Sequence, residues 1–173
     1  NQTYEIVELP KGKKALKNKW VFKLKKDGSG KVVKYKARLV VKGFQQKKGI
    51  DFDEIFSPVV KMTSIRVILG LVASMNFELE PMDVKTVFLH EDLKEEIFSS
   101  RKGFEVSGEN LVCKLKKSLY GLKQAPRQWY KKLDSCMMSQ GYKKTATDEC
   151  VYIQKFNVCI GVYEARYCLR SGN

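Results

Sequence analysis

Residues 19–42 read KWVFKLKKDGSGKVVKYKARLVVK, and this stretch predicts a two-stranded antiparallel ribbon. At its centre, Asp27–Gly30 contains the Asp, Gly and Ser residues that are typical of a tight hairpin turn. The flanking segments, Lys19–Lys25 and Val32–Lys42, alternate apolar and basic residues, although imperfectly. We therefore expect these two segments to be strands that pair across the turn.

The two faces of this ribbon should differ in chemistry. Side chains along a strand point to opposite faces in turn, so Trp20, Phe22 and Leu24 should share one face. Lys23 and Lys25 should then lie on the other face. The sequence predicts a basic ribbon with an apolar back.

The charge of the chain is concentrated in the same part of the sequence. The net charge is +14, from 33 Lys and Arg against 19 Asp and Glu. Residues 1–50 hold 15 of these basic residues and 3 acidic ones, whereas residues 51–173 hold 18 and 16. A one-sided excess favours a surface that binds a polyanion, and a basic surface that only keeps the domain soluble is the alternative. Because the basic residues alternate with apolar ones, nucleic acid is the favoured ligand.

The rest of the chain predicts a mixture of helices and strands in one body with two subdomains. The clearest helix is Ala125–Gln140, where Trp129, Leu133 and Met137 form an apolar stripe and Gly141 follows. A second helix should run from a cap at Thr63 or Ser64 to Met75, where Asn76 ends it, and Asp92–Glu96 should form a short helical turn. Further strands are expected at Tyr4–Leu9, Phe77–Val84, Leu111–Leu115, Val151–Phe156 and Cys159–Val162.

Several classes of protein are disfavoured by composition. No apolar run approaches the roughly 20 residues that span a bilayer, and no signal peptide is recognisable, so we expect an intracellular protein, in the cytoplasm or nucleus, without a membrane partner. Five cysteines without a CxxC pair and a single His argue against zinc and suit reduced thiols. The chain has no initiator Met, so we expect it to begin inside a longer reading frame. The composition leaves the oligomeric state open.

One acidic residue stands out. Asp83 ends the strand expected at Phe77–Val84, and a carboxylate at a strand end can hold a hard cation such as Mg²⁺. On the residues alone, a turn cap is the commoner role for such an Asp.

Five phrases together resemble the reverse transcriptase of copia-type long-terminal-repeat retrotransposons. They are KWVFK at 19–23, KARLVVKGF at 36–44, FSPV at 56–59, DVKTVFLH at 83–90 and SLYGLKQAPRQWY at 118–130. The similarity runs from about Thr3 to Phe156. It implies an α+β fold with fingers and a partial, truncated palm. Residues 1–60 would be the fingers-like basic hairpin region and residues 61–156 the partial palm.

The resemblance also implies roles for individual residues. Asp83 would be the first catalytic aspartate and a ligand of Mg²⁺. Arg38 would contact the triphosphate of a dNTP, with Lys23 as a weaker candidate. Phe88 would pack under the sugar, and Tyr120 and Gly121 would form the loop against the nucleotide and template. The basic hairpin adds three candidate contacts to an RNA or DNA template–primer, Lys25, Lys36 and Lys42.

The chain departs from the family's pattern after Phe156. The family has an Asp-Asp pair there, whereas the only acidic residue after Glu149 is Glu164, and residues 157–173 are expected to be a divergent tail. A frame change or a splice into unrelated sequence are both open as its origin. We therefore expect a reverse transcriptase fragment that is catalytically inactive alone. The alternative is a non-catalytic nucleic-acid-binding module or a domesticated remnant.

Overall fold

The computed structural model describes residues 2–82, 84–90, 92–101, 110–154, 157–161 and 166–170. The chain divides into two compact units. Unit 1 comprises Asn1–Ile55 and Phe88–Ala125, and unit 2 comprises Phe56–Val87 and Pro126–Asn173. Because the chain leaves unit 1, returns to it and leaves again, the units interleave along the sequence. The expected linear division into residues 1–60 and 61–156 does not coincide with them.

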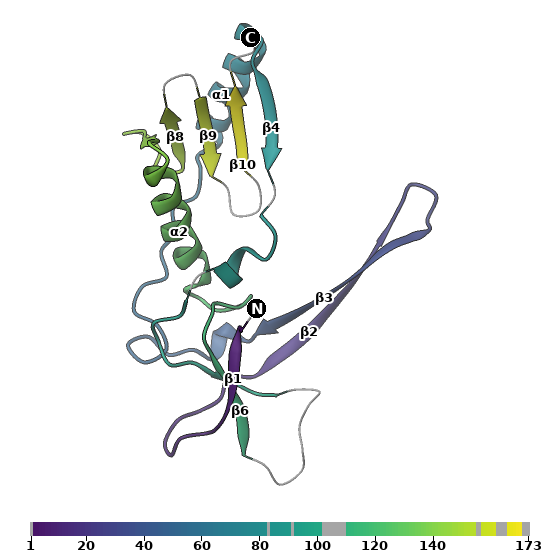
Figure 1. Cartoon of the computed structure of the whole chain (residues 1–173), viewed down its shortest axis with the longest axis vertical. Helices are drawn as coiled ribbons and strands as arrows, with labels where there is room; N and C mark the ends of the chain where they lie inside the picture. Colours follow the sequence, from purple (N-terminus) through teal and green to yellow (C-terminus); the bar gives the residue numbers. More distant parts are fainter. Residues whose placement is uncertain are drawn as a thin grey trace. The chain divides into compact units, whose positions relative to one another are not determined.

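Unit 1 contains a small antiparallel sheet and a separate ribbon. The sheet has the strand order β1-β6-β5, with β1 at Tyr4–Glu8, β5 at Phe98–Ser99 and β6 at Leu111–Leu115. The ribbon consists of β2 (Asn18–Lys26) and β3 (Val32–Val41), and it extends away from the sheet (Figure 1). The predicted hairpin and the strands at its two sides are thus confirmed.

The turn of the ribbon is held by one carboxylate. Asp27 Oδ1 accepts hydrogen bonds from the Ser29 amide at 2.9 Å, the Ser29 hydroxyl at 2.6 Å and the Lys31 amide at 3.0 Å. The hydrogen bond from the Ser29 hydroxyl is the main cause that lowers the pKa of Asp27. Gly30 has a φ of +84°, which a residue with a side chain rarely adopts.

The base of the ribbon is anchored in the core of unit 1. The core side chains come from the segments that surround this base, namely Leu16, Val41, Ile97, Leu115, Leu119, Leu122 and Ala125. Asn18 at the start of β2 is also buried, and its Nδ2 donates to Ser99 Oγ at 3.0 Å and to the Ser100 carbonyl at 2.6 Å. The outer part of the ribbon, by contrast, is exposed on both faces.

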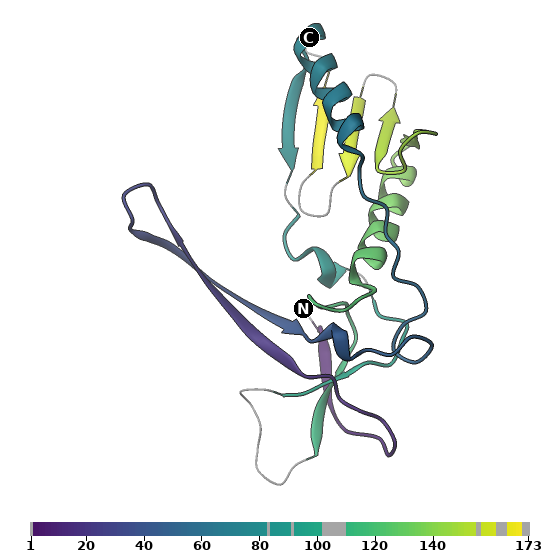
Figure 2. The same cartoon turned by 180° about the vertical axis from the view of Figure 1, so that it is seen from behind.

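Unit 2 is built on a five-stranded antiparallel sheet with the order β4-β10-β9-β8-β7. Its strands are β4 (Glu78–Met82), β7 (Lys143–Lys144), β8 (Val151–Gln154), β9 (Asn157–Gly161) and β10 (Arg166–Arg170). Helix α1 (Met62–Met75) lies across one face of this sheet (Figure 2), where Ile68 packs against Val151. Residues 157–173 were set apart as a divergent tail, and their described part forms two inner strands of the sheet.

The two helices follow their predicted patterns to different degrees. In α2 (Ala125–Ser139) the expected stripe of Trp129, Leu133 and Met137 is buried. Helix α1 ends at Asn76 as expected, with a φ of +52°. Its predicted cap is wrong, because Lys61 occupies the cap position without a side-chain hydrogen bond.

The helical turn expected at Asp92–Glu96 is also wrong. This segment contains no helical turn: Asp92 forms an isolated antiparallel bridge with Lys117, and the backbone bends at Glu95. The Lys117 ammonium lies 2.8 Å from Asp92 Oδ1, and the Leu93 amide donates to the Lys116 carbonyl. Leu93 packs against the core of unit 1, so burial of this side chain and pairing with a neighbouring segment outweigh local helix propensity. The short helical turn falls earlier, at Val87–His90 (η2), and a second one is Gly43–Gln45 (η1).

The buried carboxylate of Asp148 caps α1 in place of a side chain at the cap position. Asp148 Oδ2 accepts hydrogen bonds from the Ser64 hydroxyl at 2.6 Å and the Lys61 amide at 2.9 Å, and Oδ1 accepts one from the Cys150 amide at 3.0 Å. Burial alone would raise the pKa of Asp148, but these hydrogen bonds lower it, and the lowering prevails. Asp148 therefore ties the start of α1 to the turn before β8.

We expect Asp148→Ala to lower the free energy of unfolding by about 2–3 kcal/mol at neutral pH, because it removes these hydrogen bonds in a buried place. The folded-state pKa of Asp148 is lowered, so its stabilisation is present at neutral pH and is lost as the pH falls below about 4. Denaturant titrations of the unmodified chain and of Asp148→Ala, from neutral to acid pH, measure the difference in their free energy of unfolding. If this difference is the same at all pH values, the lowered pKa assigned to Asp148 is contradicted.

Candidate nucleic-acid interface

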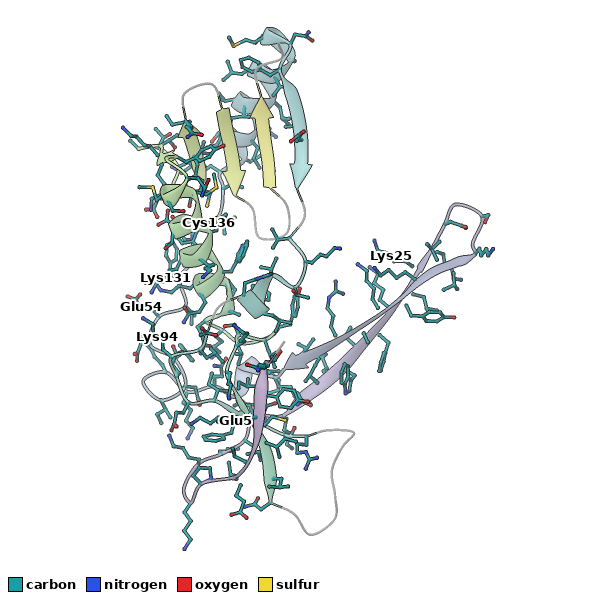
Figure 3. All side chains as sticks on the ribbon, in the orientation of Figure 1. Glu5, Lys25, Glu54, Lys94, Lys131 and Cys136 are labelled. Carbon is teal, nitrogen blue, oxygen red and sulfur yellow. The ribbon has the colours of Figure 1, made fainter. Side chains whose placement is uncertain are left out.

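The register of the ribbon sorts its side chains onto two faces. Directly opposed residues of an antiparallel pair share a face, and β2 and β3 pair Lys23 with Lys36, Lys25 with Lys34 and Val21 with Arg38. The basic side chains on this face, here called the basic face, are Lys19, Lys23, Lys25, Lys34, Lys36 and Arg38. Figure 3 shows Lys25 on this side of the ribbon. The predicted separation of basic and apolar residues is confirmed.

The basic face is arranged for an anion. Two lysine pairs stand directly opposite each other, and like charges at such positions destabilise a two-stranded ribbon. Strands β2 and β3 themselves contain no Asp or Glu. A bound polyanion removes this repulsion, so the surface favours phosphates.

Lys42 is not part of the basic face. Strand β3 ends at Val41, and Lys42 is half-buried at the start of η1, where its amide donates to the Lys17 carbonyl at 2.8 Å. The sequence pattern continues the strand to Lys42, but the contact with residue 17 and the turn at Gly43 end the alternation one residue earlier. Lys25 and Lys36 do lie on the basic face.

Three of the expected nucleotide-binding residues lie together in unit 1. The guanidinium carbon of Arg38 lies 5.7 Å from the centre of the Tyr120 ring, a cation–π distance. The rings of Tyr120 and Phe88 meet edge to face, with 4.8 Å between their centres and 75° between their planes. These residues come from β3, from η2 and from the loop before α2, so tertiary structure assembles the cluster.

The Tyr120-Gly121 loop is held against the end of β3 by close backbone contact. The Val41 amide donates to the Tyr120 carbonyl at 2.8 Å. Gly121 has a φ of +92°, and a Cβ at this residue would overlap the Val41 carbonyl oxygen. A Cβ at Gly43 would in turn overlap the Gly121 carbonyl oxygen. The loop can lie this close only because both residues are glycine.

Sequence reasoning missed a pair of buried glutamines behind this loop. Gln46 Nε2 donates to Gln124 Oε1 at 2.9 Å, and Gln46 Oε1 accepts a hydrogen bond from the Lys123 amide at 2.8 Å. Gln124 Nε2 donates to the Asp51 carbonyl at 3.0 Å. Gln124 stands within SLYGLKQAPRQWY, four residues after Tyr120, but an uncharged side chain carries no signal that would single it out. The pair positions the Tyr120 loop rather than contacting a ligand.

The expected metal ligand Asp83 lies outside the described residues, as does Glu164. Strand β4 ends at Met82, whose backbone partner in β10 is Arg166. The described parts of β9 and β10 contain neither Asp nor Glu. Within the described ranges, no group of three His, Cys, Asp or Glu side chains could hold a metal ion.

Comparison with known proteins assigns the class. The family described as reverse transcriptase (RNA-dependent DNA polymerase) matches residues 1–173, and the chain belongs to this family. The matched range includes the segment after Phe156 that we expected to fall outside the family.

The relatives define the kind of reverse transcriptase. The chain is 70% identical over 159 residues to the Pol polyprotein of transposon TNT 1-94 from Nicotiana tabacum, covering 91% of this chain and 12% of the relative. It is 38% identical over 156 residues to the Pol polyprotein of transposon RE1 from Arabidopsis thaliana, covering 88% and 11%. The yeast transposon Ty1-BL Gag-Pol polyprotein is 28% identical over 141 residues. The chain thus corresponds to a fragment of a copia-type retrotransposon Pol polyprotein and spans about an eighth of its first relative.

No solved structure matches this chain. Neither helix in the described part of the chain combines the length and hydrophobicity that crossing a membrane requires.

We expect Gly121→Ala to lower the free energy of unfolding by at least about 3 kcal/mol, because the methyl group adds backbone overlap to an unfavourable positive φ. Gly12→Ala is the matched control, since Gly12 has a φ of +81° but nothing within 4 Å of an added Cβ. That variant should cost only about 1–2 kcal/mol. Equal losses in thermal unfolding would show that the close approach to Val41 is unimportant.

Proposed function

We propose that this fragment binds nucleic acid through the basic face of the β2–β3 ribbon and does not copy it. The observation that carries the proposal is the pairing of Lys23 with Lys36 and of Lys25 with Lys34, on strands without an acidic residue. Lysine ammonium groups bind phosphates without reading sequence, so the face suits the backbone of an RNA or DNA template–primer.

The cluster at the base of the ribbon supports a nucleotide site beside this surface. An Arg side chain offers a planar fork that matches phosphate oxygens, so Arg38 is suited to the triphosphate of a dNTP. The edge-to-face contact with Tyr120 supports a role for Phe88 in packing under the sugar of that nucleotide. By analogy with the family, Gly121 then lies against the nucleotide and template. We assign the ribbon region to fingers and the five-stranded sheet with its helices to a partial palm.

Inactivity follows from the missing carboxylates. Phosphoryl transfer by polymerases uses two ions about 3.5–4 Å apart, which stabilise the attacking and leaving oxygens. For Mg²⁺ these ions need several oxygen ligands, and Asp83 would have to find partners in a sequence without an Asp-Asp pair. After Glu149 the only acidic residue in the sequence is Glu164.

We also place the chain inside the cell, in the cytoplasm or nucleus. Cys113, Cys136 and Cys150 are all free thiols, which supports a reducing compartment.

The triple variant Lys23→Gln, Lys25→Gln and Lys34→Gln should make duplex binding less sensitive to salt. Each phosphate contact contributes about 0.9 to the slope of log K against log salt, so the slope should become shallower by about 2.7. Fluorescence anisotropy over a salt series measures it. Removing opposed lysines should not lower the melting temperature, because the repulsion between them disappears.

Three exposed lysines elsewhere provide the matched control, Lys11→Gln, Lys131→Gln and Lys143→Gln, which removes the same charge. If both triple variants change the slope equally, binding depends on net charge and the basic face has no special role.

A primer-extension assay tests the inactivity. We expect no dNTP incorporation on an RNA template with Mg²⁺ or with Mn²⁺, because too few carboxylates are available to hold two ions. Incorporation by the unmodified chain that disappears in Asp83→Asn would refute this part of the proposal and leave nucleic-acid binding untouched.

A further inference from the structure

The back of the ribbon is an exposed apolar surface. The register pairs Trp20 with Leu39, Phe22 with Ala37 and Leu24 with Tyr35, and these six side chains are here called the apolar face. Tyr35 is 78% exposed and Phe22 75% exposed, although both are large aromatic residues. The rings of Trp20 and Phe22 stack at 6.2 Å between their centres. Soluble monomers rarely expose a continuous apolar surface of this kind, so we expect the apolar face to contact a partner.

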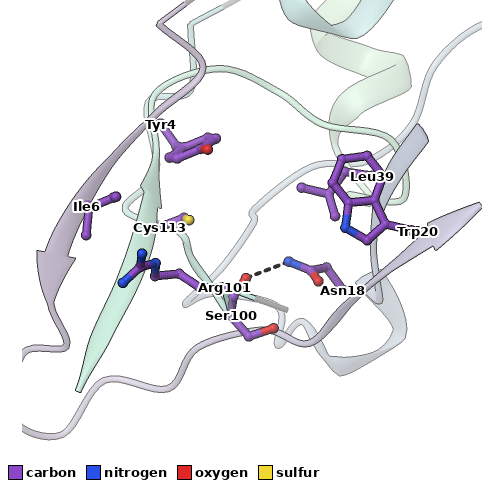
Figure 4. A pocket seen from close by; sticks show the side chains of 8 residues that line it. All are labelled: Tyr4, Ile6, Asn18, Trp20, Leu39, Ser100, Arg101 and Cys113. Atoms are coloured by element: carbon purple, nitrogen blue, oxygen red, sulfur yellow. Dashed lines mark hydrogen bonds between the residues drawn. The ribbon is translucent and has the colours of Figure 1, made fainter. Parts of the chain in front are cut away.

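The apolar face runs into a pocket at the base of the ribbon. The pocket has a volume of about 320 Å³, and Trp20 and Leu39 line it together with Tyr4, Ile6 and Cys113 from the sheet (Figure 4). Its lining is thus mainly apolar and aromatic, as in sites that receive a ring.

The apolar face itself carries an exposed ring that suits such a pocket. Tyr35 is highly exposed and stands four residues from Leu39 along β3. At about 3.3 Å per residue, Tyr35 lies roughly 13 Å from the pocket along the same face. It therefore cannot fill the pocket of its own chain.

We infer that a second copy of this chain docks on the apolar face, with the two ribbons back to back and antiparallel. In this arrangement the Tyr35 ring of each copy enters the pocket of the other, against Trp20 and Leu39. A two-fold axis near Phe22 relates the two identical contacts, as self-complementary surfaces require.

Charge and area agree with this partner. The lysines at positions 19, 23, 25, 34 and 36 lie on the basic face, so back-to-back packing keeps them apart. Lys26, the remaining lysine of the two strands, pairs with Val32 after the register shift at the outer end of the ribbon. The exposed parts of the four largest apolar-face side chains, with those of Tyr4 and Ile6, amount to roughly 600 Å² per copy on typical side-chain areas. Two such surfaces bury roughly 1,200 Å², the lower end for a specific interface. The dimer should be reversible and depend on concentration.

Sedimentation of the full chain without nucleic acid, in enough salt to screen its charge, tests the inference. We expect a monomer–dimer equilibrium that Tyr35→Ala weakens at least about tenfold, because each dimer loses two rings from its two pockets. Phe22→Lys should abolish the dimer. Phe44→Lys is the matched control, because Phe44 is 77% exposed in the same unit but lies outside the apolar face. A monomer at all concentrations would overturn the inference.

Disulfide cross-linking between two copies tests the proposed position of residue 35 in the pocket. Under mild oxidation, Tyr35→Cys should form a disulfide-linked dimer with the native Cys113 that lines the pocket, and adding Cys113→Ser should prevent it. Burial raises the pKa of the Cys113 thiol, so the oxidation is carried out above neutral pH. Cross-linking that persists without Cys113 would contradict the docking.

Nucleic-acid bases are the other conceivable occupant of this face. If Phe22→Lys leaves the oligomeric state unchanged but weakens binding of single-stranded DNA, the face stacks on bases and the inference is wrong. The basic face remains exposed in the dimer, so the two proposals fail separately: loss of dimerisation leaves the salt dependence of binding intact.

Discussion

The close backbone contact between the end of β3 and the Tyr120-Gly121 loop holds the candidate site of unit 1 together. The Val41 amide reaches the Tyr120 carbonyl, and glycine at 43 and 121 lets the two segments lie in contact. This contact brings Tyr120 beside Arg38 and Phe88, and the buried Gln46–Gln124 pair supports it from behind. Without it, the ribbon would remain a hairpin but would carry no nucleotide site.

The ribbon combines two surfaces that serve different partners. Alternation along two paired strands puts cations on one face and aromatic rings on the other, so one short element can bind phosphates and dock a second copy. Neither surface needs the carboxylates that polymerisation requires. The proposed nucleic-acid surface and the expected metal ligand Asp83 are thus carried by different parts of the chain.

Much of the local structure was predictable because it depends on neighbouring residues. The DGSG turn, the alternation of Trp20 and Phe22 with Lys23 and the stripe of α2 follow from short-range pattern, and the structure has all three. The Asp92–Glu96 turn was wrong because Leu93 is held by the core of unit 1, a contact that no local pattern reveals. The capping of α1 by Asp148 spans 84 residues from Ser64 and was equally hidden.

The sequence by itself determined the family, the basic character of the ribbon and the absence of an Asp-Asp pair, because these depend on residue identity and order. Tertiary structure alone decided that Arg38, Tyr120 and Phe88 meet, that Lys42 leaves the basic face, and that the apolar face runs into a pocket. These facts depend on which distant segments pack together. Packing is set by burial and backbone contact across the whole unit, and no single stretch of sequence contains that information.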